Sequence, residues 1–495
     1  MAAVEPHVPS GSAPGEKGLR GDALGMISSI VIGVASTAPG YSLAASLGLV
    51  VAAVGFAAPA IMWLAFIPML LVATSYYYLN RVDPDCGTTF SWATKAFGPW
   101  VGWIGGWAII VADIIVMANL ADIAGRYTFL LFGLDEQADS KYWVMLIGVI
   151  WIAVMTYICY VGIEASAKSQ WFLLGAELVA LLVFAVIALV KVYTGNAPET
   201  SVKPSLEWLN PFAIDSTSSL TAGILVAIFI YWGWDSLVAV NEETEDKERT
   251  PGIAAILSTI ILVFIYLIVS IAAQAYAGPD FLVDNADDVL SALGDGVLGW
   301  ASSLLIIAVL TSAAASTQTT ILPTTRTSLS MAVKGAIPKY FGKIHPRYLT
   351  PSASTIWMGA LPIISYAGLT VVSQNILYDS IAALGLMIAF YYGLSGFACV
   401  WFFRRSMKTA KGWLLAGVAP LLGALILTWV FVKSIVDLTD PENSGSGESW
   451  LGLGPPIVIA GLFLLGGVVF MFLQWRAQPA FFRQKSQVAP PEVTL

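Results

Sequence analysis

Two short stretches of the chain combine helix-breaking residues with polar side chains inside otherwise apolar segments. Backbone N–H groups freed at such a break can hold a carboxylate, and freed carbonyl groups can accept hydrogen bonds from an ammonium group. A free amino acid carries both groups, so the two stretches together predict a binding site for a small zwitterion. The candidate substrate-binding residues are Ser36, Thr37, Ala38, Gly40, Tyr231, Trp232, Gly233, Trp234 and Asp235.

The first stretch interrupts its segment through Pro39 and Gly40. Proline lacks an N–H group and clashes with the preceding turn, and glycine adds backbone freedom. The hydroxyl groups of Ser36 and Thr37 can bond the freed backbone groups. The alternative is a simple proline kink, which is common in membrane helices.

The second stretch places Gly233 and the ionisable Asp235 near the middle of an apolar run. A carboxylate at that depth costs several kcal/mol unless it is paired or hydrated, which favours a hydrated site. The alternative is that Asp235 only caps the following half-helix. The aromatic side chains beside it fit either a lid with a cation–π contact to an ammonium group or ordinary packing.

Four further residues are candidates for a coupling ion or proton: Asp113, Glu177, Ser316 and Thr317. A buried carboxyl group such as Glu177 can take up and release a proton, and Asp113 can serve coupling or amine binding. Ser316 and Thr317 can bind an ion through their hydroxyl groups. For all four, a hydrogen bond between helices is the structural alternative.

The composition places these residues in a membrane. Of the 495 residues, 57% are hydrophobic and 11% are charged, whereas a soluble domain has about 25% charged residues. About twelve apolar runs are long enough to cross a bilayer. They are predicted near Gly25–Val51, Phe56–Leu79, Trp100–Leu131, Trp143–Val161, Ser169–Thr194, Ser219–Val240, Gly252–Ala277, Val297–Arg326, Ser352–Val372, Ser380–Phe403, Gly412–Ile435 and Pro455–Trp475.

Charge predicts the orientation of these spans. An even number of spans places both termini on one side, and most of the 24 Lys and Arg residues then fall in segments of that side. The positive-inside rule therefore predicts cytoplasmic termini in the cell membrane. The terminal segments 1–24 and 476–495 are polar and are expected to be flexible, and no cleaved signal peptide is expected.

The spacing of the spans predicts an internal repeat. Roughly 200 residues separate the two breaks, and the same offset separates the second span from the seventh and the third from the eighth. A pair of broken helices in corresponding positions of two repeats is typical of transporters. Five spans in a copy are an odd number, so the second copy enters the membrane from the opposite side. The predicted transporter domain, 25–475, comprises a first repeat at 25–195, an inverted second repeat at 219–404 and two extra helices at 412–475.

On these motifs the chain resembles the amino acid–polyamine–organocation superfamily of permeases, from about Asp22 to Trp475. The broken first span is one match. The other three are the loop Pro84–Pro99 with Gly106-Trp107, the break Tyr231–Asp235 with the turn Asn241–Pro251, and Arg326 with Ile337–Phe341 and His345–Pro351. The chain departs from the family pattern at Ser36–Gly40, where many relatives have more glycines, and at Gly87-Thr88, where two glycines are usual.

The resemblance implies an all-α membrane protein with an inverted five-plus-five bundle and broken helices 1 and 6. It implies secondary transport of an amino acid, coupled to protons or driven by exchange, with Na⁺ the less favoured ion. The chain contains no P-loop, so ATP is not expected to drive transport. A cofactor, a metal, a nucleic acid partner and an enzymatic activity are not expected, and the oligomeric state stays open.

Three other functions are alternatives to an amino acid permease. A permease for polyamines or other amines would use Asp235 and Asp113 to bind a cation that lacks a carboxylate. A membrane sensor without transport would need a long soluble signalling domain, and an intramembrane enzyme would need a His or Ser–His constellation. The only histidines, His7 and His345, lie in polar segments.

Overall fold

The computed structural model describes residues 17–286, 288–372, 376–444 and 446–488, and within these ranges the chain is built from helices. The first half contains α1 (Met26–Ser36), α2 (Pro39–Val54), α3 (Ala58–Val82), α4 (Thr89–Phe97), α5 (Pro99–Leu131), α6 (Asp135–Ala138), α7 (Lys141–Val161) and α8 (Ile163–Thr194). The second contains α9 (Thr217–Ile230), α10 (Ser236–Ala239), α11 (Thr250–Ala277), α12 (Pro279–Asp284), α13 (Val289–Leu298), α14 (Ser303–Val333), α15 (Ser352–Val372) and α16 (Ile376–Phe403). The last part contains α17 (Ala410–Gly412), a π-helical stretch (Trp413–Val418), α18 (Ala419–Asp437), α19 (Pro455–Ala477) and α20 (Pro479–Phe482).

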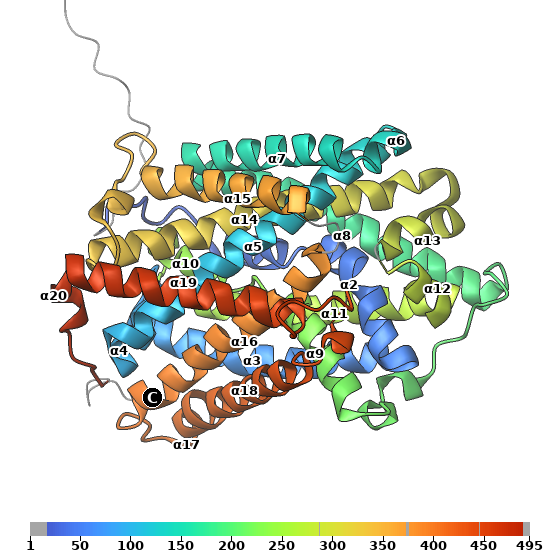
Figure 1. Ribbon diagram of the computed structural model, residues 1–495. Coiled ribbons are helices and arrows are strands. Elements are labelled where there is room, and N and C mark those ends of the chain that lie inside the picture. The colour runs from blue at the N-terminus through green and yellow to red at the C-terminus, as the bar shows by residue number, and fades with distance from the viewer. Residues whose placement is uncertain (1–16, 287, 373–375, 445, 489–495) are drawn as a thin grey trace, which may run out of the picture.

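The long helices run side by side as a bundle (Figure 1). In this view α7 and α15 lie along one edge and α18 lies along the opposite edge, with α5, α14 and α16 between them. Nine helical stretches among the described residues are long and apolar enough to cross a membrane. The predicted all-helical membrane fold is therefore confirmed.

The predicted count of twelve spans differs from nine in how three regions are divided. The stretch Met26–Val82 is one of the nine and contains both the first and the second predicted spans. The interrupted sixth span has only a short apolar helix, Thr217–Ile230, which is not counted among the nine. The ninth predicted span corresponds to α15, which is not among the nine either. The prediction of twelve treats these regions as four crossings.

The eighth predicted span, Val297–Arg326, is displaced along the chain in the structure. The helix α14 begins at Ser303 and continues past Arg326 to Val333. Arg326 therefore lies inside the helix, seven residues before its end. In the structure this guanidinium group is fully buried and pairs with Glu243 at 2.8 Å, so its charge does not end the helix.

Helices that correspond in the predicted repeat pack against one another. The helix α5 contacts α14, α3 contacts α11, and α7 contacts α15. The last pair also has equal lengths of 21 residues. These contacts are what a two-fold relationship between the halves predicts, and the inverted repeat itself stays a prediction.

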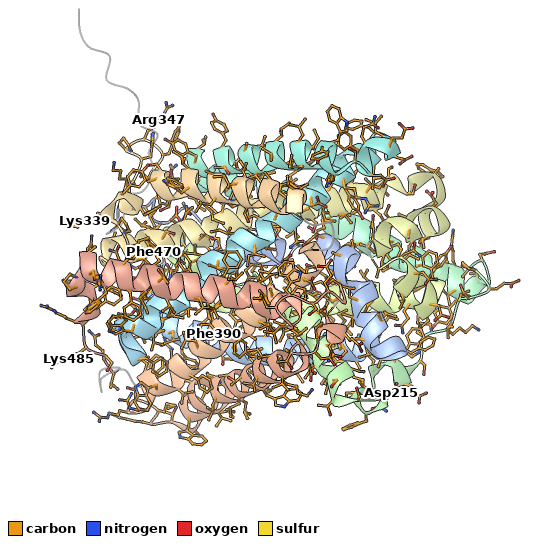
Figure 2. All side chains as sticks on the ribbon, viewed as in Figure 1. Asp215, Lys339, Arg347, Phe390, Phe470 and Lys485 are labelled. Carbon is orange, nitrogen blue, oxygen red and sulfur yellow. The ribbon has the colours of Figure 1, made fainter. Side chains whose placement is uncertain are left out.

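Parts of both terminal segments are packed against the bundle. The ring centroid of Phe482 in α20 lies 4.7 Å from that of Trp100 in α5, and Leu24 pairs with Thr244 in an isolated bridge. The remainder of the segments that were expected to be flexible, 1–16 and 489–495, lies outside the described residues. Figure 2 shows Lys339, Arg347 and Lys485 at one end of the molecule, hereafter the basic end, and Asp215 at the opposite end.

Candidate functional site

The first span is interrupted rather than bent. Helix α1 ends at Ser36 and α2 begins at Pro39, with Ala38 in the left-handed conformation at φ 47°. Proline is suited to the first turn of a helix, because that position needs no N–H donor. The break therefore follows from Pro39 as a helix start and not as a kink within one helix.

The second break is longer. Helix α9 ends at Ile230, and the chain then turns through Gly233 at φ 115° before the short helix α10 begins at Ser236. The freed carbonyl oxygen of Ile230 accepts a hydrogen bond from the hydroxyl group of Tyr266 at 2.6 Å. A glycine is needed at Gly233, since other residues are strained at this φ.

The two breaks meet in the interior. The hydroxyl oxygens of Ser36 and Ser236 lie 2.7 Å apart, and Ser316 of α14 donates a hydrogen bond to the carbonyl oxygen of Ser36 at 3.1 Å. A Cβ atom placed on Gly233 would lie 2.5 Å from the same carbonyl oxygen. Close approach of the two chain segments therefore requires the missing side chain of Gly233.

A small cavity lies where the breaks meet, and we call it the central cavity. Its volume of about 10 Å³ corresponds to the space for roughly one water molecule. A solute can bind here only when the surrounding helices move apart. The lining residues are Ser36, Ile109, Asp113, Trp232, Gly233, Asp235, Ser236, Thr320, Pro323 and Tyr391.

Both carboxyl groups of the central cavity are held by hydroxyl groups. Asp235 accepts hydrogen bonds from Tyr392 at 2.7 Å and Tyr391 at 3.2 Å. Asp113, on α5, accepts one from Thr324 of α14. All of these side chains are buried, so hydroxyl groups replace water as the hydrogen-bond donors to both acids.

Glu177 lies on the other side of the first break. Its Oε1 atom accepts hydrogen bonds from the backbone N–H of Gly40 at 2.7 Å and from the hydroxyl group of Ser312 at 2.8 Å. The backbone N–H of Tyr41 donates to the Ser312 oxygen at 3.0 Å. The exposed fraction of Glu177 is 0%, and its Oε2 atom has no hydrogen-bond partner among the described residues. The side chain thus occupies the N-terminus of α2 with its own carboxyl group.

Five of the predicted site residues line the central cavity together: Ser36, Asp113, Trp232, Gly233 and Asp235. Ser316 bonds the wall of the cavity, and Gly40 instead faces Glu177 and α14.

The other predicted residues point elsewhere. Tyr231 donates to the carbonyl oxygen of Met62, and Trp234 packs against Tyr76 and Tyr392. The side chains of Thr37 and Thr317 bond carbonyl groups of their own helices. Ala38 supplies the left-handed turn of the break.

Several residues of the site were missed by sequence reasoning. Tyr391 and Tyr392 on α16 hold Asp235, Thr320 and Thr324 on α14 face α5, and Ser312 holds Glu177. The adjacent pair Tyr391-Tyr392 is the available signal, because two hydroxyl-bearing aromatic residues inside an apolar span need buried acceptors.

A network of ion pairs lies toward the basic end of the bundle. The ammonium group of Lys17 lies 2.9 Å from Asp85 and 2.5 Å from Glu242, and Lys334 lies 2.8 Å from Asp85. Burial opposes the negative charge of Asp85, but Lys334 and Lys17 outweigh it and hold the pKa of Asp85 well below its usual range. Burial likewise opposes the charge of Lys17, yet Cys86, Asp85 and Glu242 keep its pKa raised.

The same cluster contains three groups of the kind that bind metals. One ligand atom each from Asp85, Cys86 and Glu242 lie within 4.8 Å of one another. The Lys17 ammonium group lies against both carboxylates, so it supplies the positive charge at this point. We therefore treat the cluster as an ion-pair network that ties the N-terminal segment to two loops.

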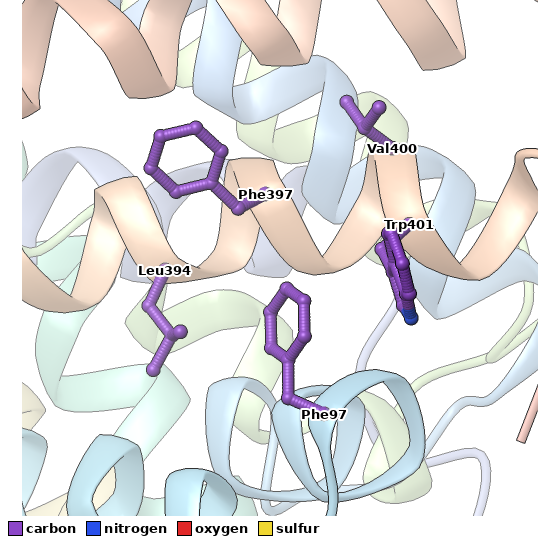
Figure 3. Close-up of a pocket in the computed structure, with 5 residues that line it drawn as sticks. All are labelled: Phe97, Leu394, Phe397, Val400 and Trp401. Carbon is purple, nitrogen blue, oxygen red and sulfur yellow. The ribbon is translucent and has the colours of Figure 1, made fainter. Parts of the chain in front are cut away.

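A separate apolar hollow of about 320 Å³ lies between α4 and α16 (Figure 3). Its lining residues are Phe97, Leu394, Phe397, Val400 and Trp401. They provide no charged or hydroxyl group for a polar solute, so we assign no transport role to this hollow.

Comparison with known proteins matches most of the chain to one family. Residues 22–469 match the family described as amino acid permease. The chain belongs to this family. This amino acid permease is therefore a multi-pass membrane protein, as its nine apolar helical stretches also indicate.

Individual relatives of this permease are distant. It is 24% identical over 309 residues to the vacuolar cationic amino acid transporter 4 of Arabidopsis thaliana, covering 60% of this chain and 50% of that relative, so it spans half the length of that protein. It is 23% identical to the low-affinity putrescine importer PlaP of Escherichia coli K12, covering 79% of this chain and 82% of the importer. It is 22% identical to the human Asc-type amino acid transporter 1, covering 82% and 73% of the two chains.

Proposed function

We propose that this permease is a secondary active transporter that moves an amino acid across the cell membrane through the central cavity. The meeting of two broken helices at a buried cavity with two carboxyl groups and two serine hydroxyl groups carries this proposal. Asp235 and Asp113 would attract the ammonium group of the substrate, and the backbone of the two breaks would hold its polar end. Trp232 would cover the apolar part of the substrate.

The small volume of the central cavity supports transport by alternating access. In the closed arrangement, Trp232 donates to the hydroxyl group of Tyr391 and the two serine hydroxyl groups touch. Substrate binding requires these contacts to separate on one side, while the network of Lys17, Asp85 and Lys334 stays closed on the other. By the positive-inside rule, this basic end and both termini would lie in the cytoplasm.

We assign proton coupling to Glu177. Its protonation would remove a charge from the N-terminus of α2, where Gly40 donates its N–H group, and would weaken the hold of α8 on the first break. Ser316 and Ser312 face the same break from α14. A bound Na⁺ is the alternative use of these oxygens.

The charge of the cavity favours a second candidate substrate, an amine without a carboxylate. Asp113 and Asp235 are both acidic, and the N–H groups of Gly40 and Tyr41 are already bonded to Glu177 and Ser312. Little of the α2 N-terminus then remains for a substrate carboxylate. The putrescine importer among the relatives is consistent with this alternative.

Uptake into proteoliposomes distinguishes the two candidates. The purified permease would be tested with labelled amino acids and labelled putrescine under imposed pH and sodium gradients. Accumulation of an amino acid that follows the pH gradient supports the proposal. Competition by putrescine but by no amino acid would overturn it in favour of the amine permease.

A further inference from the structure

A further hollow lies toward the basic end and, unlike the central cavity, faces outward from the bundle. It is a groove of about 340 Å³ between α5, α14, α15 and α19, and we call it the lateral groove. Its walls include Trp107, Ile110, Phe341, Trp357 and Phe470. The indole N–H of Trp107 is bonded to the carbonyl oxygen of Phe463, so this large side chain presents apolar surface to the groove.

The depth of the lateral groove follows from where its residues lie on their helices. Trp107 is near the start of α5, Ser328 near the end of α14, Trp357 near the start of α15 and Phe470 near the end of α19. At 1.5 Å per residue each lies within about 12 Å of its helix end. Half of the hydrocarbon core is about 15 Å thick. These four residues therefore lie in the acyl-chain region of the leaflet at the basic end, and Ile114, farther along α5, extends the groove toward the bilayer midplane.

The mouth of the groove carries positive charge. The segment Lys339–Gly342 forms a 3-10 turn, and its Phe341 lines the groove. The side chains of Lys339, at the start of this turn, and Lys343, directly after it, are exposed. Ser354 of α15 donates a hydrogen bond to the carbonyl oxygen of Phe341 at 2.8 Å, which fixes the turn beside the groove. Each lysine is two residues from Phe341, and the ammonium group of Lys343 lies 4.8 Å from the ring centroid of Tyr340, so positive charge lies on the turn that lines the groove.

We propose that the lateral groove binds an anionic phospholipid, with one acyl chain between α15 and α19 and the phosphate group held by Lys339 and Lys343. An acyl chain matches the apolar walls, because an unfilled groove in a bilayer forfeits contacts. The charge selects the headgroup, since basic pockets on this side of membrane proteins attract anionic lipids. The proposal rests on the membrane location of the family and not on the identity of the transported solute.

One residue connects the groove with the transport site. Thr324 lines the lateral groove, and its hydroxyl group is bonded to Asp113, which lines the central cavity. An acyl chain in the groove packs against the back of this threonine. The lipid thus contacts the same part of α14 that holds one of the two acids of the site.

Photolabelling of the full-length permease tests the proposal. The protein would be placed in phosphatidylcholine nanodiscs with a small fraction of phosphatidylglycerol that carries a diazirine on its acyl chain. We expect labelled peptides from α15 and α19 around Trp357 and Phe470. In the variant Lys339→Ala/Lys343→Ala this labelling should fall at least about fivefold, because each lysine contributes to anionic lipid binding.

Two controls make the result specific. The variant Arg405→Ala/Lys411→Ala removes two exposed basic residues next to α16 and in α17, and it should keep full labelling. Ser328→Phe should block labelling by filling the groove. If this buried substitution prevents folding, the test rests on the variant Lys339→Ala/Lys343→Ala, whose changes lie on the surface. Equal labelling by a phosphatidylcholine probe, or unchanged labelling in the Lys339→Ala/Lys343→Ala variant, would overturn the proposal. Neither readout depends on transport, so the proposed function is tested separately.

Discussion

The hydroxyl oxygens of Ser36 and Ser236 lie 2.7 Å apart, although the two residues are 200 positions apart in the chain. One belongs to the end of α1 and the other to the start of α10, so a single hydrogen bond joins the two breaks. The carbonyl oxygen of Ser36 also accepts from Ser316. Separation of the two breaks for substrate entry must therefore disrupt two contacts of Ser36, one with Ser236 and one with Ser316.

The first prediction concerns the contact between the breaks at Gly233. In Gly233→Ala the new methyl group would meet the Ser36 carbonyl oxygen at 2.5 Å, and the φ of 115° is unfavourable for alanine by about 1–2 kcal/mol. We expect uptake to fall at least about tenfold for an equal amount of folded protein. The measurement is the initial rate of uptake, normalised by size-exclusion chromatography of the fluorescently tagged protein.

The matched control for this change is Gly175→Ala. Gly175 lies in α8, and a Cβ atom there would meet nothing within 4 Å. This variant should transport like the parent. Equal activity of the two variants would mean that close approach of the breaks is not needed.

The second prediction tests the acid of the second break. Asp235→Asn keeps the shape of the side chain but removes the charge that would hold an ammonium group. Hydrogen bonds to charged groups contribute about 1.5–3 kcal/mol, so we expect an uptake loss of roughly 10- to 150-fold. Tyr392→Phe removes one donor to Asp235 and should give a smaller loss. Normal uptake by Asp235→Asn would remove this residue from the site.

Much of this site follows from sequence, and its limits have physical causes. Pro39, Gly233 and Asp235 are local signals, because a helix breaker or a buried acid is recognisable without knowledge of its neighbours. The partners Tyr391 and Thr324 depend on which faces of α16 and α14 meet the breaks. The rotation of a helix cannot be read from its pattern when the helix is apolar on all sides, as α16 is, or carries hydroxyl groups on several sides, as α14 does. For the same reason the sequence does not reveal that the hydroxyl group of Thr317 bonds its own helix.

The third prediction separates coupling from binding at Glu177. Glu177→Gln retains an oxygen that can accept from Gly40 and Ser312 but cannot exchange a proton. We expect accumulation driven by a pH gradient to disappear while exchange of internal for external substrate continues. Proteoliposomes with and without preloaded substrate measure the two activities. Survival of pH-driven accumulation would place the proton elsewhere, and loss of exchange as well would indicate a structural role.

The fourth prediction uses Cys86 as a native reporter of the charge network. Burial raises the pKa of this thiol well above its usual value, and its exposed fraction is 0%, so it should react slowly with a maleimide. Lys17→Ala removes ion pairs to Asp85 and Glu242, so the loop around Cys86 should open more often. Lys17 also favours the thiolate, but we expect the gain in exposure to outweigh its loss and to speed labelling at least about tenfold. The measurement uses a background without the other two cysteines, Cys159 and Cys399.

The pH dependence of the network follows from Asp85. Because Lys334 and Lys17 outweigh burial and hold its pKa well below the usual value, the stabilisation is complete above the ordinary aspartate pKa of about 4. It is lost only as pH falls through the depressed pKa. The labelling ratio between Lys17→Ala and the parent should therefore be the same at pH 7 and pH 5. A ratio that collapses at pH 5 would contradict this assignment.

The buried pair of Glu243 and Arg326 also sets an order of events during synthesis. The two residues are 83 positions apart, which takes a ribosome roughly 4–17 s at about 5–20 residues per second. Throughout that interval Glu243 has been synthesised and Arg326, its ion-pair partner in the finished structure, has not. The loop after the sixth span gains this ion pair only once α14 has been made, so the contacts around the second break are completed late. A nascent chain stalled before Arg326 would hold the first broken helix but not a finished site.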